Sequence, residues 1–132
     1  MRIALAFILP ALALLLLVPN GGCSDSGTTP GDEIVFPDSN VSYTAHVQPY
    51  MTLRCATYGC HDNATRSGNL NLTTYMDMTA RPGVVIPKDS KSSLLMQRID
   101  GRLPHPPNVP IIINQNQLNG IKRWIDEGAK YN

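Results

Sequence analysis

The sequence predicts a small, mostly α-helical domain in which about three short helices are joined by long loops. Eleven prolines and ten glycines divide the chain into short pieces, and this excludes long helices. Apolar residues recur at helical spacing in three of these pieces. The remaining pieces lack the sustained alternation of apolar and polar residues that would justify predicting a β-sheet.

The first helix is expected to begin at about Ser42 or Pro49 and to end at Ala56. Pro49 suits a first-turn position, because its fixed φ angle fits a helix there and its missing N–H is not needed. The helix leads the chain directly into Cys55. Its apolar contacts are expected from Val47, Tyr50, Met51 and Leu53.

A second helix is expected to begin after Asp89 or Ser90, either of which can cap it, and to end at Gly101. Its residues at helical spacing are Leu94, Leu95, Arg98 and Ile99. Between the first two helices, residues 67–87 contain Leu70 and Leu72 in alternation with polar residues. Residues 84–86 could form a short extended piece, but the pattern does not justify a sheet.

The third helix has the clearest pattern, NQNQLNGIKRWIDEGAKYN. Asn114 or Asn116 is expected to cap its start, and Gly128 is expected to close its end. One apolar face is formed by Leu118, Ile121, Trp124 and Ile125.

The N-terminus has the pattern of a secretory signal, which assigns residues 1–22 to a signal peptide. Arg2 precedes an apolar run over residues 3–18, too short for a membrane span, which needs about 20 residues. Two glycines directly before Cys23 resemble a bacterial lipoprotein box, in which that cysteine is lipidated. Asn20 stands where such boxes usually have an aliphatic residue, so ordinary cleavage without a lipid is the alternative. Residues 23–40 are then a flexible tether, and residues 41–132 form the single folded domain.

Charge excludes one class of partner. Without Arg2, the chain has ten Lys and Arg against ten Asp and Glu, and no basic run is present. Nucleic acid is therefore not an expected partner. The expected location is outside the cytoplasmic membrane, in the periplasm or at the cell surface, with a lipid on Cys23 as the anchor.

The segment CATYGCHDN, residues 55–63, is the richest in chemistry, and three interpretations of it remain open from the residues alone. Cys55, Cys60 and His61 could attach a haem, although the four-residue spacer is longer than the usual two and needs Gly59 to turn it outward. The two cysteines could instead form a disulfide, since exported proteins meet an oxidising environment. A zinc site would need a fourth ligand, such as Asp62 or His105.

The order of motifs from residue 47 to residue 129 resembles a bacterial c-type cytochrome domain. The matching segments, in order, are VQPYMTLRCATYGCHD, SGNLNLTTY, PKDSKSSLLMQRI, GRLPHPP and LNGIKRWIDEGA. The resemblance implies one covalent haem c, carried by thioethers from Cys55 and Cys60, with His61 as the proximal iron ligand. It also implies a fold of helices and loops around that haem, with Trp124 and Ile125 as core.

One departure from the family concerns the second axial ligand. The family's loop offers methionine before proline, but here Leu103 precedes Pro104, and leucine cannot bind iron. His105, on a loop stiffened by prolines, is the first candidate for the sixth position. The reserves are Met96, Met76 and Met78, and an open position is the remaining alternative; His46 could do no more than flank the site.

The leading hypothesis is an electron-transfer protein that exchanges electrons with redox partner proteins. The alternative is a haem-free exported binding or scaffold domain with a Cys55–Cys60 disulfide. An enzyme is not expected, because a haem enzyme needs an open iron site with an acid or base beside it, and only His105 is close in sequence.

Overall fold

Four α-helices and two short helical turns make up the secondary structure of the described residues, which contain no β-strand. The structure is a computed structural model that describes Gly31, residues 33–107 and residues 109–132. The prediction of a mostly α-helical fold is confirmed. The predicted signal peptide, Cys23 and the first part of the predicted tether lie outside the described residues. None of the helices in the described part has the length and apolar content of a membrane span.

The first helical segment joins a π-helical stretch, η1 (Tyr43–Val47), to α1 (Gln48–Arg54). Ser42 caps its start, and its Oγ accepts a hydrogen bond from the N–H of Ala45 at 3.2 Å. Pro49 lies in the first turn of α1, as expected, although η1 continues the helix in front of it. The segment ends two residues before the predicted end.

One apolar contact predicted on this helix is wrong. Val47, Tyr50 and Met51 are fully buried, but the side chain of Leu53 is 41% exposed. On a helix with 3.6 residues per turn, Leu53 lies nearly opposite Met51 and points away from the core.

A short helix that was not predicted, α2 (Tyr75–Ala80), lies in the segment between the first and second predicted helices. Thr74 caps it by accepting a hydrogen bond from the N–H of Asp77 at 3.1 Å. Met78 is completely buried, and the hydroxyl of Tyr75 donates to the carbonyl of Ala129 at 2.9 Å. Tertiary contacts therefore fix a helix that is too short for a clear apolar period.

The second predicted helix is α3 (Leu94–Ile99), and its predicted cap is wrong. The residue in the cap position is Ser93, because Asp89 belongs to a separate turn, in which its carboxylate accepts from the N–H of Ser92 at 3.0 Å. The buried hydroxyl of Ser93 accepts from the N–H of Ile86 at 2.8 Å. Residues 84–86, considered as a short extended piece, are part of this turn-rich connection.

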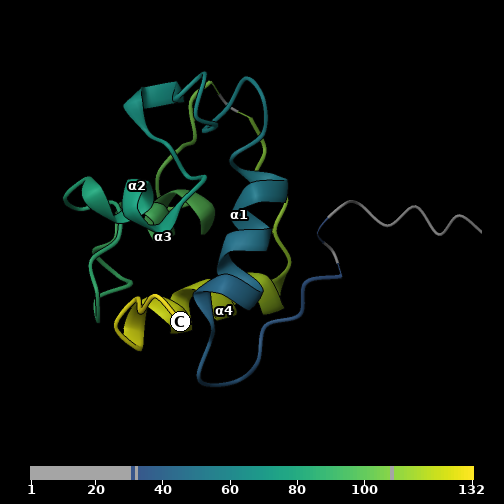
Figure 1. Ribbon diagram of the computed structural model, residues 1–132, viewed down its shortest axis with the longest axis vertical. Coiled ribbons are helices and arrows are strands. Elements are labelled where there is room, and N and C mark those ends of the chain that lie inside the picture. Colours follow the sequence, from purple (N-terminus) through teal and green to yellow (C-terminus); the bar gives the residue numbers. More distant parts are fainter. Residues whose placement is uncertain (1–30, 32, 108) are drawn as a thin grey trace, which may run out of the picture.

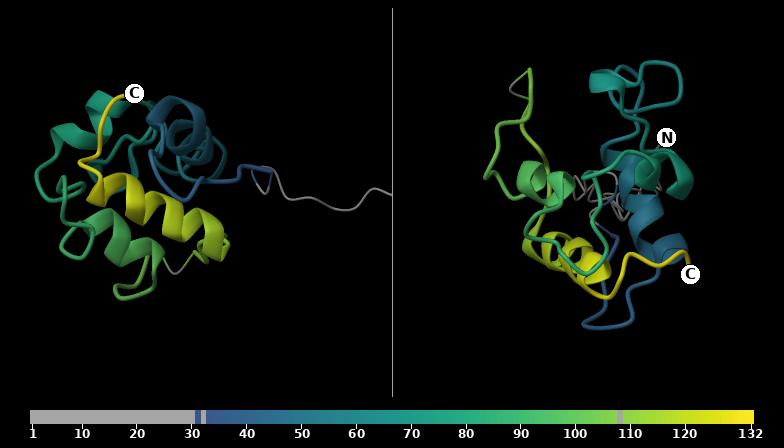
Figure 2. Two further views of the ribbon diagram at one scale, coloured as in Figure 1. Left: turned by 90° about the horizontal axis from the view of Figure 1, so that it is seen from below. Right: turned by 90° about the vertical axis from the view of Figure 1, so that its left-hand side faces the viewer.

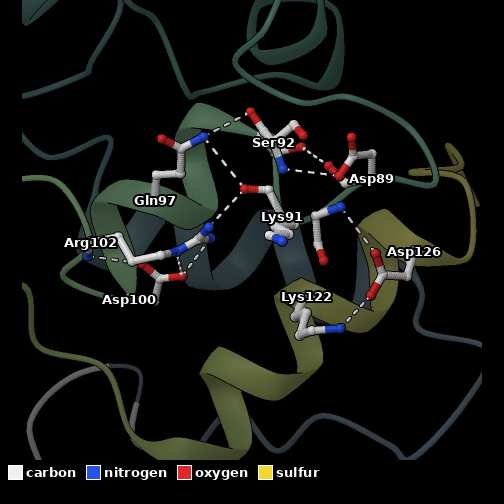
Figure 3. Close-up of polar contacts among 10 residues, drawn as sticks. Asp89, Lys91, Ser92, Gln97, Asp100, Arg102, Lys122 and Asp126 are labelled. Atoms are coloured by element: carbon white, nitrogen blue, oxygen red, sulfur yellow. Dashed lines mark hydrogen bonds and ion pairs between the residues drawn. The ribbon is translucent and has the colours of Figure 1, made fainter.

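Figure 3 shows how the loops on both sides of α3 are tied to each other and to α4 (Gln115–Asp126). The guanidinium of Arg102 pairs with Asp100 at 2.7 Å and donates to the carbonyl of Lys91 at 2.8 Å. The carboxylate of Asp126 accepts from the N–H of Ser90 at 3.0 Å. These contacts fix the start of the loop that follows α3.

The third predicted helix, α4, agrees with the sequence pattern at both ends. Asn114 forms a capping box with Gln117, in which each side chain accepts from the other residue's backbone N–H. Gly128 follows the helix with a φ angle of 108°, in the left-handed region that glycine adopts easily. Trp124 and Ile125 are buried, as expected of core residues.

The folded part begins earlier than predicted. Phe36 lies in the predicted tether, yet its side chain is only 2% exposed. Its backbone is paired with Asn116 of α4, which accepts from the Phe36 N–H at 2.8 Å and donates to the Phe36 carbonyl at 3.0 Å. Residues 33–40 therefore pack as part of the domain, because they supply an apolar side chain that α4 buries.

Figure 1 shows α1 upright, with α4 crossing below its start and α2 and α3 to one side. In Figure 2, α3 lies alongside α4, and the two helices are in contact. Asn132 joins the chain end to the first helical segment, because its Oδ1 accepts from the Tyr43 N–H at 2.9 Å. The buried hydrophobic core consists of Phe36, Val41, Tyr43, Val47, Tyr50, Met51, Leu72, Met78, Val84, Val85, Leu95, Met96, Ile99, Ile121, Trp124, Ile125 and Ala129.

Replacing Gly120 with alanine is expected to destabilise the fold by about 1–3 kcal/mol, as overpacking of a core does. A Cβ at this position would fall well inside van der Waals contact with the ring of Phe36. Urea unfolding measures the effect. Asn119→Ala, on the exposed neighbour, is the matched control and should change the free energy of unfolding little. Equal stability of both variants would contradict the packing of Phe36 on α4.

Candidate functional site

The cysteine loop, residues 55–67, begins where α1 ends. Cys55 is the cap residue of α1, and its N–H donates to the carbonyl of Met51 at 2.9 Å. The position of Cys55 is thus fixed by α1, which packs against the core through Tyr50 and Met51.

The four-residue spacer turns outward and returns. The N–H of Cys60 donates to the carbonyl of Thr57 at 3.0 Å, and the N–H of His61 donates to the carbonyl of Cys55 at 3.1 Å. Gly59 has a φ angle of 84°, as the sequence predicted for a residue that bends this spacer. Tyr58, at the outside of the turn, is 93% exposed. The backbone therefore places His61 beside Cys55 despite the additional residues.

Both cysteines of the loop are free and half-buried. Burial raises the pKa of the Cys55 thiol to about 12, and the neighbouring Cys60 adds to the shift. At neutral pH Cys55 is therefore a protonated thiol. Within the described residues no three His, Cys, Asp or Glu side chains gather as a metal site, so the zinc interpretation finds no support.

The ring of His61 is oriented by a backbone carbonyl. Its Nδ1 lies 3.3 Å from the carbonyl oxygen of Leu70, which can only accept a hydrogen bond, so Nδ1 carries the proton. The other ring nitrogen, Nε2, is then the one with a free lone pair. This is the arrangement that metal-binding histidines generally adopt.

His105 lies next to His61, although 43 positions separate them in the sequence. Their ring centroids are 5.7 Å apart, and the rings are nearly perpendicular, at 88°. Burial lowers the pKa of His105, and His61 and Arg98 add to the effect, so the imidazole is neutral at neutral pH. The Nδ1 of His105 is buried without a hydrogen-bond partner.

Contacts from α3 hold the loop that carries His105. The guanidinium of Arg98 donates to the carbonyl of Pro104, directly before His105. The N–H of Leu103 donates to the carbonyl of Gln97 at 2.7 Å. Beside His105 is an open cavity of about 330 Å³, lined by Arg98, Ile99, Asp100, Gly101, Leu103, Pro104, His105, Val109 and Ile111.

The three reserve ligands, and His46 as a possible flanking residue, lie elsewhere. Met96 and Met78 are core residues, with side chains 3% and 0% exposed. Met76 is 73% exposed on α2. His46 lies in η1, where its ring centroid is 5.8 Å from that of Phe36. Of the residues considered for the sixth position, His105 is the one whose ring contacts His61.

Asp62 was considered only as a zinc ligand, but the structure gives it a different place. Its carboxylate accepts hydrogen bonds from the backbone of Thr65, Ala64 and Gly59, and the bond from Thr65 contributes most to lowering its pKa. Aspartate commonly bonds to backbone N–H groups two or three residues further on, so this turn could have been predicted from the residue type. No comparable feature of the sequence predicts the hydrogen bond from Arg98 to Pro104.

The donor set suits a haem. His61 and His105 bring two imidazoles into contact, with ring centroids 5.7 Å apart, and an imidazole nitrogen is a usual ligand of haem iron. The Nδ1 of His105 is buried without a hydrogen-bond partner, and the Leu70 carbonyl leaves the Nε2 of His61 as its lone-pair nitrogen, so each ring has a nitrogen that could bind a metal.

Comparison with known proteins gives one match. Residues 58–106 match the family model described as Planctomycete cytochrome C. The matched segment includes Cys60, His61 and His105 and begins three residues after Cys55. No curated protein and no solved structure matches the chain.

Proposed function

We propose that this bacterial cytochrome c-like domain carries one covalently attached haem c and transfers electrons outside the cytoplasmic membrane. The family match supports haem binding and electron transfer in general. One observation supports the proposal of a covalent haem held by two histidines. The rings of His61 and His105 are in contact, with centroids 5.7 Å apart, and Cys55 and Cys60 lie in the same loop as His61.

Cys55 and Cys60 are the proposed attachment residues. Each thiol would add across one vinyl group of the haem: a sulfur–carbon bond would form, the vinyl double bond would become single, and the thiol hydrogen would move to the adjacent vinyl carbon. No electrons are gained or lost. The end of α1 fixes one thiol, and the turn at Gly59 brings the other back toward it.

His61 and His105 are the residues that would hold the haem iron. The carbonyl of Leu70 keeps the proton of His61 on Nδ1, so that Nε2 is available to iron. Bound haem supplies an iron that cycles between the ferrous and ferric states, one electron at a time. If His61 and His105 both held the iron, no iron position would be left for a substrate, and this supports an electron carrier over an enzyme.

The proposed cellular setting follows the N-terminal sequence. A signal peptide over residues 1–22 would export the chain, and a lipid on Cys23 would anchor it to a membrane. The proposed location is the periplasm or the cell surface, where redox partner proteins would supply and accept the electrons.

The test of the function is the spectrum of the purified protein. After reduction with dithionite we expect the sharp α band of a low-spin c haem, and reoxidation should remove it reversibly. A protein with no such band after expression with the haem-attachment machinery would leave the haem-free scaffold as the function. That alternative also requires a Cys55–Cys60 disulfide, which the mass of the non-reduced protein would reveal.

Replacing His105 with methionine is expected to raise the reduction potential, because methionine in place of histidine favours ferrous iron. The expected change is on the order of 0.1 V, within the range of about 0.8 V that axial ligands span. Potentiometric titration measures it. His105→Ala should instead open the sixth position and allow carbon monoxide to bind. If neither variant differs from the parent protein, His105 is not a ligand.

A further inference from the structure

One carboxylate holds both ends of the turn that contains Cys60. The Oδ2 atom of Asp62 accepts from the N–H of Gly59 at 3.2 Å and from the hydroxyl of Thr65 at 3.2 Å. Its Oδ1 atom accepts from the N–H of Ala64 at 2.8 Å and from the N–H of Thr65. Asp62 thus connects the residue before Cys60 to the residues after His61.

Ser67 adds two hydrogen bonds to this turn, and together with those of Asp62 they form what we call the brace. Its N–H donates to the carbonyl of Cys60 at 2.9 Å, and its hydroxyl donates to the carbonyl of Gly59 at 3.3 Å. The N–H of Gly59, which donates to Asp62, also donates to the hydroxyl oxygen of Thr65 at 3.1 Å. The peptide groups on both sides of Cys60 are therefore held by residues 62–67.

The two cysteines are fixed by different means. Cys55 is held by α1, through its hydrogen bond to Met51. Cys60 lies outside any helix, and its position depends on the turn that Asp62 braces. A spacer of four residues has more conformations than one of two, so the second thiol needs this additional restraint.

We propose that Asp62 is a positioning residue for haem attachment, which holds Cys60 where its thiol can reach the second vinyl group. The inference rests on the proposed function. Each thioether forms by addition of a thiol across a vinyl group, with the hydrogen moving to the adjacent carbon, so attachment requires no oxidant and depends on placement. Loss of the brace should spare the bond to Cys55 and impair the bond to Cys60.

The experiment compares Asp62→Ala with Asp62→Asn in protein matured with the haem-attachment machinery. The denatured protein is alkylated and cut with trypsin, which cleaves after Arg54 and Arg66 and releases peptide 55–66. In the parent protein this peptide should carry haem and no alkyl group. In Asp62→Ala most of it should carry haem and one alkyl group on Cys60, and the α band should move to longer wavelength because one vinyl group remains.

Two further variants complete the test. Asp62→Asn keeps one oxygen that can accept from Ala64 and Thr65, so its loss of the Cys60 bond should be smaller. Asp89→Ala is the matched control, since Asp89 also accepts from a backbone N–H in a turn, at 3.0 Å from the nitrogen of Ser92, but away from the cysteine loop. It should retain both thioethers.

The outcomes separate this inference from the proposed function. If the parent protein carries haem through both cysteines and Asp62→Ala does so equally, the inference alone is wrong. If the parent peptide carries no haem, the proposed function and the inference both fail. Selective loss at Cys60 in the alanine variant, with the control unchanged, supports the inference.

Discussion

Replacing His61 with alanine is expected to abolish the low-spin spectrum while the haem remains attached. His61 is the residue whose backbone returns to Cys55 and whose ring contacts His105. If His61 holds the haem iron as proposed, the variant lacks that ligand, and the iron should be high-spin. Absorption and electron paramagnetic resonance spectra of the oxidised protein measure the change.

His46→Ala is the matched control for this prediction. The ring of His46 contacts Phe36 at 5.8 Å between centroids, in η1 at the other end of the first helical segment from Cys55. Its removal should leave the haem spectrum as it is. A low-spin spectrum that survives in His61→Ala would exclude His61 as the proximal ligand.

Replacing Cys55 and Cys60 together with serine is expected to eliminate covalent haem completely. Serine has no thiol to add to a vinyl group, and the two residues are the proposed attachment cysteines. Acidified organic solvent should then extract any haem from the double variant but none from the parent protein. Each single variant should keep one thioether and show the red-shifted α band.

Cys23→Ser is the control that separates haem attachment from membrane anchoring. Cys23 is the third cysteine of the chain and is the predicted lipidation residue. The variant should retain covalent haem and, if the lipid prediction holds, should no longer fractionate with membranes. Extractable haem in this variant would mean that Cys23 takes part in attachment.

The sequence predicted the helices with a long apolar period better than the short ones. For α4, the cap at Asn114, the buried Trp124 and the closing Gly128 all agree with the structure. The six-residue α2 was missed, because its helicity depends on burial of Met78 and not on a repeating pattern. The burial of Phe36 was also missed, since one aromatic residue in a polar segment gives no period.

The features of the site that depend on neighbouring residues in the sequence could be predicted. The turn at Gly59 follows from the spacer length, and His105 is the first candidate ligand because Leu103 occupies the position of the methionine in the family that the sequence resembles. Three contacts could not be predicted. The ring contact between His61 and His105 joins segments that are distant in sequence. The hydrogen bonds from His61 to Leu70 and from Arg98 to Pro104 depend on the direction of a side chain. A single sequence contains no signal for such pairings.

The mass of tryptic peptide 55–66 under non-reducing conditions tests the central claim most directly, because this peptide contains Cys55, Cys60 and His61 and no other cysteine. A haem joined through both cysteines predicts the peptide mass plus one haem, with no thiol left for alkylation. A mass two hydrogens below that of the reduced peptide would show a disulfide and would contradict the account.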